Sequence, residues 1–137
     1  MNEISFTGNV SKIHETRHKG NGETIFSFDL AVENGYWDKT REKWISRTRF
    51  QPVVTFRELA VNVAQTLKVG MAVTVTGLLL DDSFTPNGAQ YAVRRDKLEA
   101  TDVAISLRRA TAVVTKTGKS REEEGREHNR QQLTTAA

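Results

Sequence analysis

The sequence predicts an all-β domain that contains one helix. Short stretches rich in valine and threonine recur along the chain, and several alternate apolar with polar residues, which is typical of strands buried on one face. A single segment, residues 55–67, has apolar residues at helical spacing instead. With 37% hydrophobic and 27% charged residues, the composition is that of a globular protein with one core.

Six strands are expected from these patterns. They cover residues 4–10, 24–32, 44–55, 71–79, 90–99 and 110–114. In the second strand Phe26 and Phe28 share a face with Leu30 and Val32, so both phenylalanines are expected in the core, as is Phe6. Turn signals separate the strands at residues 18–22 and 85–88.

Two residues predict irregularities in the sheet. Gly77 lies within the fourth expected strand, where it indicates a bulge or a sharp bend, as closed sheets require. Pro52 removes a hydrogen-bond donor from a strand that is expected to be internal. It therefore predicts a sheet edge or a bulge at that point.

The helix separates the third strand from the fourth. Residues 55–58 fit a capping box, and Gly70 lies close behind the last turn, where a C-cap is expected. Three strands, a helix and further strands are the order of the OB-fold, a five-stranded Greek-key barrel with the helix between strands three and four. An SH3-like barrel and a split sandwich remain alternatives, although neither explains a helix at this place.

The chain divides into two parts by composition. Residues 1–114 are expected to form the OB-fold domain, and residues 115–137 a disordered polar tail, because Leu133 is the tail's one large apolar residue. Residues 116–137 hold five basic and four acidic residues, a net charge of +1.

Residues 36–57 concentrate aromatic and basic side chains. They contain five of the ten aromatic residues, and six basic against two acidic residues give them a charge of +4, more than the +3 of the whole chain. Aromatic faces that stack on bases and cations that neutralise phosphates are what holds an unpaired nucleic-acid strand. The same pattern also fits a hairpin whose aromatic residues fill a core while its charges face solvent.

Several segments resemble, in order and spacing, the bacterial single-stranded DNA-binding proteins. They are F-T-G-N-V at residues 6–10, F-S-F-D-L-A-V at residues 26–32, F-Q-P-V-V-T-F at residues 50–56 and G-M-A-V-T-V-T-G-L-L at residues 70–79. Residues 106–114 look like the closing segment of the actinobacterial branch, so the resemblance covers about residues 3–114. It implies an OB-fold, sequence-tolerant binding of single-stranded DNA in replication, recombination or repair, and a homotetramer associated with the nucleoid.

The resemblance also implies where DNA is bound. The family's base-stacking positions fall on Tyr36 (or its neighbour Trp37), Phe50, Phe56 and Phe84. Together with nearby cations and Trp44, the candidate DNA-binding residues are Arg17, Tyr36, Trp37, Lys39, Arg41, Lys43, Trp44, Arg47, Arg49, Phe50, Phe56, Phe84, Arg94 and Arg95.

Two departures from the family leave a second hypothesis open. Asp81 and Asp82 stand where the family has basic or polar residues, and carboxylates beside Phe84 would repel phosphate. Residues 131–137 lack the family's acidic, phenylalanine-ended tip, so recruitment of enzymes through an acidic tail is not expected. The alternative is a paralogue or mobile-element version, an OB-fold oligomerisation or interaction protein that binds DNA weakly.

Enzymatic, metal and membrane functions are not expected. Cysteine is absent, which excludes disulfides and thiol catalysis. Residues 14–18 form an H-E-x-x-H motif, but zinc binding requires that motif on a helix, and here it runs into the 20–22 turn. Asp81 and Asp82 would point to opposite faces of a strand, so a metal-dependent nuclease site is not predicted either. No cofactor is expected, and with neither a signal peptide nor an apolar run of ~20 residues a cytoplasmic protein is predicted.

Overall fold

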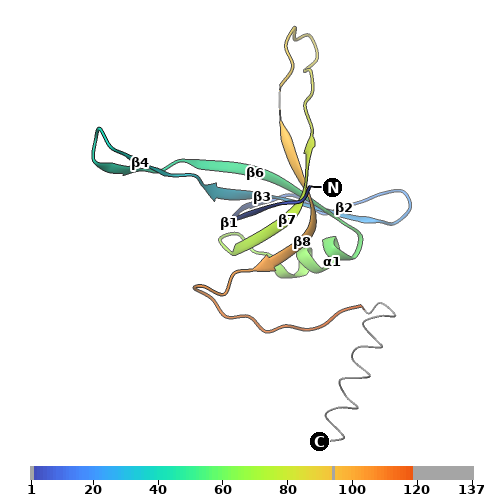
Figure 1. Ribbon diagram of the computed structural model, residues 1–137. Coiled ribbons are helices and arrows are strands. Elements are labelled where there is room, and N and C mark those ends of the chain that lie inside the picture. The colour runs from blue at the N-terminus through green and yellow to red at the C-terminus, as the bar shows by residue number, and fades with distance from the viewer. Residues whose placement is uncertain (1, 94, 119–137) are drawn as a thin grey trace, which may run out of the picture.

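The computed structural model describes residues 2–93 and 95–118 (Figure 1). Its elements are β1 (Ile4–Ile13), β2 (Arg17–His18), β3 (Thr24–Glu33), β4 (Tyr36–Asp38), β5 (Lys43–Ile45), β6 (Thr48–Phe56), α1 (Arg57–Thr66), β7 (Ala72–Asp81) and β8 (Asp96–Ile105). Within the described residues, no helix is long and apolar enough to cross a membrane.

Five of these strands close into a barrel. Strand β1 pairs antiparallel with both β3 and β7, and the remaining neighbours are β7 with β8, β8 with β6 and β6 with β3. The β6–β8 pairing is parallel and short, limited to Val53 with Leu98 and Val54 with Glu99. Helix α1 follows the third barrel strand and precedes the fourth. This is the Greek-key order of the OB-fold, so the predicted fold is confirmed.

The core lies inside the barrel and beneath the helix. Phe28, Leu30 and Leu98 are completely buried, and Phe26 nearly so, which confirms the two core phenylalanines. Helix α1 packs against β3, β6 and β8 through an apolar stripe that includes Ala60 and Val63. Phe6, also predicted in the core, is only partly buried and packs against its margin.

Three predicted strands differ from the structure. The expected strand at residues 44–55 is divided between β5 and β6, because β5 leaves the barrel and pairs only with β4. The expected strand at residues 90–99 begins six residues later, at Asp96, because the preceding residues belong to a hairpin that projects from the barrel. The expected strand at residues 110–114 is absent, and that segment is exposed irregular chain.

The predicted capping box is wrong. Phe56 is the N-cap of α1 and makes no side-chain cap hydrogen bond. The hydroxyl of Thr55 is used elsewhere: Thr55 is fully buried, and its Oγ1 donates to the carbonyl oxygen of Phe26 at 2.8 Å. The C-cap is Leu67, and Gly70 lies in the following turn with a φ of +96°.

Both predicted irregularities of the sheet are confirmed. The β7–β8 register shifts between Thr76 and Gly77, and a Cβ at Gly77 would collide with the carbonyl oxygen of Glu99. Pro52 pairs with Asp29 of β3 without a register shift. On its other side the pairing with β8 begins only at the next residue, so Pro52 occupies a local edge of β6 and no bulge is present.

Three hairpins project from the barrel in different directions (Figure 1). They are the β2–β3 hairpin, the β4–β5 arm (residues 34–47) and the β7–β8 hairpin (residues 82–95). After β8 the chain runs along the side of the domain that carries α1, where Thr117 Oγ1 donates to Asn62 Oδ1 at 3.0 Å. The predicted disorder of the tail concerns mostly residues 119–137, which lie outside the described residues.

Candidate nucleic-acid interface

A cleft of about 670 Å³ is lined by residues of β2, β3, β6 and β8 and by residues at the base of the β7–β8 hairpin. Its lining includes Arg17, Asp29, Pro52, Asp82, Arg95 and Lys97. A second hollow of about 530 Å³ is lined by Arg49, Phe50 and Gln51 and shares Pro52 and Arg95 with the cleft. The two hollows therefore adjoin and form one path over β6, called here the binding cleft.

The aromatic residues of the β4–β5 arm lie on its surface. Trp37 and Trp44 are paired across β4 and β5, and each is 56% exposed. The Trp44 ring lies close over Gly35, where a Cβ would come within 2.6 Å of the ring atoms. On Tyr36 the guanidinium carbon of Arg47 lies 5.1 Å from the ring centre. The arm is therefore a hairpin with exposed rings, and the alternative of a hairpin that buries its aromatic residues is wrong.

Strand β6 lines the second hollow of the binding cleft with Phe50 and Arg49, which point to opposite faces of the strand. Phe50 is 60% exposed. The guanidinium of Arg49 donates to Gln51 Oε1 at 2.8 Å and lies 3.8 Å from a carboxylate oxygen of Asp96. Since Gln51 is completely buried, this hydrogen bond fixes the partly exposed Arg49 side chain against the barrel.

A second ring and cation occupy the base of the β7–β8 hairpin. Phe84 is exposed and its backbone forms a bridge with Val93. The guanidinium carbon of Arg95 lies 4.9 Å from the centre of the Phe84 ring, a cation–π distance. Asp82, predicted to repel phosphate, lies 2.8 Å from Arg95 and 3.8 Å from Lys97, so its charge acts first on these two cations.

The remaining candidates lie at separate places. Phe56 is half-buried at the base of the β2–β3 hairpin, with Lys19 Nζ 5.2 Å from its ring centre. Arg17 lines the cleft from β2. The exposed cations of the arm are Lys39, Arg41, Lys43 and Arg47, of which Arg41 lies 3.7 Å from Asp38. Arg94 lies outside the described residues.

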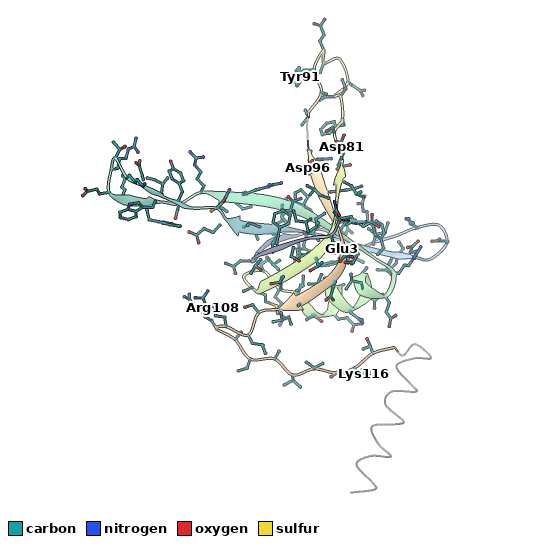
Figure 2. All side chains as sticks on the ribbon, viewed as in Figure 1. Glu3, Asp81, Tyr91, Asp96, Arg108 and Lys116 are labelled. Atoms are coloured by element: carbon teal, nitrogen blue, oxygen red, sulfur yellow. The ribbon has the colours of Figure 1, made fainter. Side chains whose placement is uncertain are left out.

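Tyr91 and Lys97 were not among the residues predicted from the sequence. Tyr91 is 67% exposed and lies on the projecting part of the β7–β8 hairpin, beyond Asp81 and Asp96 at its base (Figure 2). The continuous strand pattern of residues 90–99 predicts a barrel strand there instead. The turn signal at residues 85–88 could have located Tyr91. A residue three positions after a turn lies near the tip of the hairpin when the hairpin is long.

The H-E-x-x-H residues are not arranged for zinc. His14 directly follows β1, with its Nε2 3.2 Å from Asp29 Oδ1, and His18 lies in β2, so the motif is not helical. Among residues 2–93 and 95–118, no group of three or more His, Asp or Glu side chains is placed to hold a metal ion.

Comparisons with known proteins show which family and which solved structures this chain resembles. A model described as the single-strand binding protein family matches residues 1–105. The single-stranded DNA-binding protein of Bifidobacterium longum is 35% identical over 115 residues, which are 82% of this chain and 52% of that protein, and that of Mycobacterium leprae is 33% identical over 119 residues, or 85% and 70%. This chain thus spans about half the length of the first relative. The crystal structure of a small single-stranded DNA-binding protein from Streptomyces coelicolor aligns with a TM-score of 0.66 at 31% identity, over 79% of this chain and 96% of that one.

Proposed function

Because the chain belongs to the single-strand binding protein family, we propose that it binds single-stranded DNA with little dependence on sequence. The observation that carries this proposal is the binding cleft with the exposed rings and cations at it: Phe50 and Arg49 both line its second hollow, and Phe84 contacts the cleft residue Arg95 at the base of the β7–β8 hairpin. A ring offers every base the same apolar face, whereas edge-reading groups would be needed to discriminate bases.

The proposed mechanism divides the work between two kinds of side chain. Bases stack on Phe50 and Phe84, each stack contributing roughly 1–3 kcal/mol. Cations that line the cleft, Arg17 among them, neutralise phosphates of the same strand. A longer strand continues to the β4–β5 arm, whose exposed rings are Tyr36, Trp37 and Trp44. This function requires no catalytic step and no cofactor.

A homo-oligomer, of which a tetramer is the expected form, is part of the proposal. The chain after β8 carries Leu107, Val113 and Val114 on its surface, and the two valines are 98% and 88% exposed. Such apolar side chains on an extended segment are stabilised when a second copy covers them. Light scattering of the full chain should give a multiple of the 15.4 kDa monomer mass, and a monomer would contradict this part of the proposal. A DNA partner also implies a place at the nucleoid and a role in replication, recombination or repair.

The direct test is a titration of a fluorescent oligo-dT with the full chain at several salt concentrations. The logarithm of the affinity should fall linearly with the logarithm of the salt concentration, by about 0.7 for each phosphate neutralised. A mixed-sequence single strand should bind within a small factor of oligo-dT, and a duplex of equal length should bind more weakly. Absence of oligo-dT binding at low salt would contradict the proposal.

A second candidate, an OB-fold interaction protein with weak DNA binding, is favoured by one observation. Arg95 and Arg49, both in the binding cleft, already face carboxylates of Asp82 and Asp96. The same titration separates the two functions, because the second predicts no measurable oligo-dT binding at physiological salt.

A further inference from the structure

An aspartate at the base of the β7–β8 hairpin faces the cations of the binding cleft. We propose that Asp82 acts as an internal substitute for a DNA phosphate and thereby makes the cleft selective for strands that also offer bases to stack. It holds Arg95 and Lys97 in the free protein and competes with the phosphates of any incoming polyanion. The inference rests on the proposed function, because it concerns the same cleft.

The Asp82 carboxylate faces two cations, as a bound phosphate would. One carboxylate oxygen, Oδ2, lies 2.8 Å from a guanidinium nitrogen of Arg95, and the other, Oδ1, lies 3.8 Å from Lys97 Nζ. Each oxygen thus faces a different cation, as the two free oxygens of a phosphodiester would. All three side chains line the binding cleft.

The backbone fixes this arrangement. The Asp82 amide donates to the carbonyl oxygen of Arg95 at 2.8 Å, so the two residues face each other across the base of the hairpin. Arg95 is held further by Phe84, whose ring centre lies 4.9 Å from its guanidinium carbon. The guanidinium therefore contacts both the carboxylate and the ring, so the phosphate-binding cation and a base platform are neighbours.

A looser copy of this arrangement lies in the adjoining hollow. Asp96, the first residue of β8, faces Arg49 of β6 at 3.8 Å, and both side chains are about half exposed. The charged residues that line the two hollows balance, with a formal net charge of zero: the cations are Arg17, Arg49, Arg95 and Lys97, and the anions are Glu15, Asp29, Asp82 and Asp96. Because the lining carries no net positive charge, phosphate charge alone gives a ligand little advantage.

Selectivity follows from this exchange. A ligand that brings only negative charge exchanges one anion for another at Arg95 and gains little, whereas a single strand also gains the stacks on Phe84 and Phe50. Because Arg95 and Lys97 are already neutralised, binding also releases fewer counterions, and the dependence of affinity on salt is shallower. The closest pair is partly exposed, so its effect on affinity is modest.

The test compares Asp82→Asn with Asp102→Asn in the full chain. Both variants remove one negative charge, but Asp102 lies within β8, six residues beyond Asp96, is exposed, and accepts a hydrogen bond from the Val103 amide. The probes are oligo-dT and heparin, a polyanion without bases, each titrated over a range of salt.

Asp82→Asn should tighten oligo-dT binding about two- to fivefold at low salt and steepen its salt slope by about 0.7 for each additional phosphate that is neutralised. Heparin binding should tighten by a larger factor, so the preference for oligo-dT over heparin falls. Asp102→Asn should leave the preference and the slope unchanged. In an Arg95→Ala background the effect of Asp82→Asn should shrink. Melting temperatures verify that each variant is folded.

Three results would overturn the inference while leaving the proposed function intact. The first is that Asp82→Asn and Asp102→Asn change oligo-dT and heparin binding equally. The second is that Asp82→Asn weakens oligo-dT binding, which would make Asp82 a positioning residue for Arg95. The third is that Asp82→Asn changes oligo-dT binding as much in the Arg95→Ala background as in the wild type. If neither the wild type nor Asp82→Asn binds oligo-dT at low salt, the proposed function fails and this inference fails with it.

Discussion

Trp37 and Trp44 lie directly opposite each other on strands β4 and β5, so both indole rings belong to one face of the arm. They are the only two tryptophans of the chain. Intrinsic tryptophan fluorescence therefore reports on the β4–β5 arm alone, whereas the binding cleft contains none of the emitting rings.

We predict that a long oligo-dT quenches tryptophan fluorescence and that a very short one does not. An oligonucleotide of about four nucleotides, near the lower limit for one OB-fold, fills the cleft without reaching the arm. Quenching is measured beside the anisotropy of a labelled oligonucleotide, which shows whether binding has occurred. Binding of a long strand without quenching would show that the DNA path avoids the arm. Trp44→Ala should then leave the affinity for that strand unchanged.

The exposed rings of the cleft and the hairpin should affect binding but not stability. Phe50→Ala and Tyr91→Ala should each weaken the binding of a strand that reaches them by roughly 1–3 kcal/mol without changing the salt slope, since a stack involves no phosphate. Both rings are exposed, so thermal unfolding should be nearly unaffected.

Phe28→Ala is the matched control for these substitutions. Phe28 is completely buried, and its truncation should cost about 3–5 kcal/mol of unfolding free energy. If Phe50→Ala instead lowered the melting temperature and spared affinity, Phe50 would be a structural residue and the stacking assignment would be wrong.

At the first residue of α1, glycine should be more stabilising than alanine. Arg57 has a φ of +60°, a left-handed conformation that costs a residue with a Cβ roughly 1–2 kcal/mol. Its side chain compensates in part by lying 3.0 Å from Glu23 Oε1. Arg57→Ala loses this ion pair and keeps the strain, whereas Arg57→Gly loses both, so the glycine variant should be more stable by about 1 kcal/mol.

The control for this prediction lies four residues further along α1. Val61 is exposed in the middle of the helix, where alanine should be more stable than glycine by about 1 kcal/mol. Urea unfolding of the four variants measures both differences. The same order of alanine and glycine at both positions would refute the left-handed conformation of Arg57.

Two glycines should respond differently to alanine. At Gly77 the new Cβ would meet the main chain of β8, with Ala100 Cα at 2.8 Å, and a backbone neighbour cannot rotate away. At Gly35 it would meet the exposed Trp44 ring, which can turn aside. Gly77→Ala should therefore cost about 1–3 kcal/mol of unfolding free energy. Gly35→Ala should cost under about 0.5 kcal/mol, and instead change the Trp44 emission spectrum.

The sequence predicts the barrel better than it predicts the projecting hairpins, for a physical reason. Phe26 and Phe28 alternate with polar residues because one face of β3 is buried, and that periodicity is visible in the chain. The arm carries no such signal. Residues 44–55 have one continuous strand pattern, and only the pairing of Trp44 with Trp37 shows that the strand leaves the barrel.

The candidate site was likewise predicted in part: single residues were identified from the sequence, but contacts between residues were not. Phe50 was predicted because it lies in the aromatic and basic stretch of residues 36–57 and because the resemblance places a base-stacking position there, whereas Phe84 was predicted from the resemblance alone. The contact between Asp82 and Arg95 was not predicted, because it depends on which residues oppose each other at the base of a hairpin. That register is set by barrel pairing and not by the local sequence. Tyr91 was missed for the same reason.

The parallel pairing of β6 with β8 has a consequence for local opening of the barrel. It is limited to Val53 with Leu98 and Val54 with Glu99, whereas β3 pairs with β6 along its whole length. This seam can therefore separate at a lower free energy than the antiparallel ladders, and its amides should exchange with deuterium faster. The binding cleft lies over the seam, lined by Val53 on one side and Lys97 on the other. DNA bound in the cleft would contact both β6 and β8, and it should therefore slow the exchange of the amides at this seam.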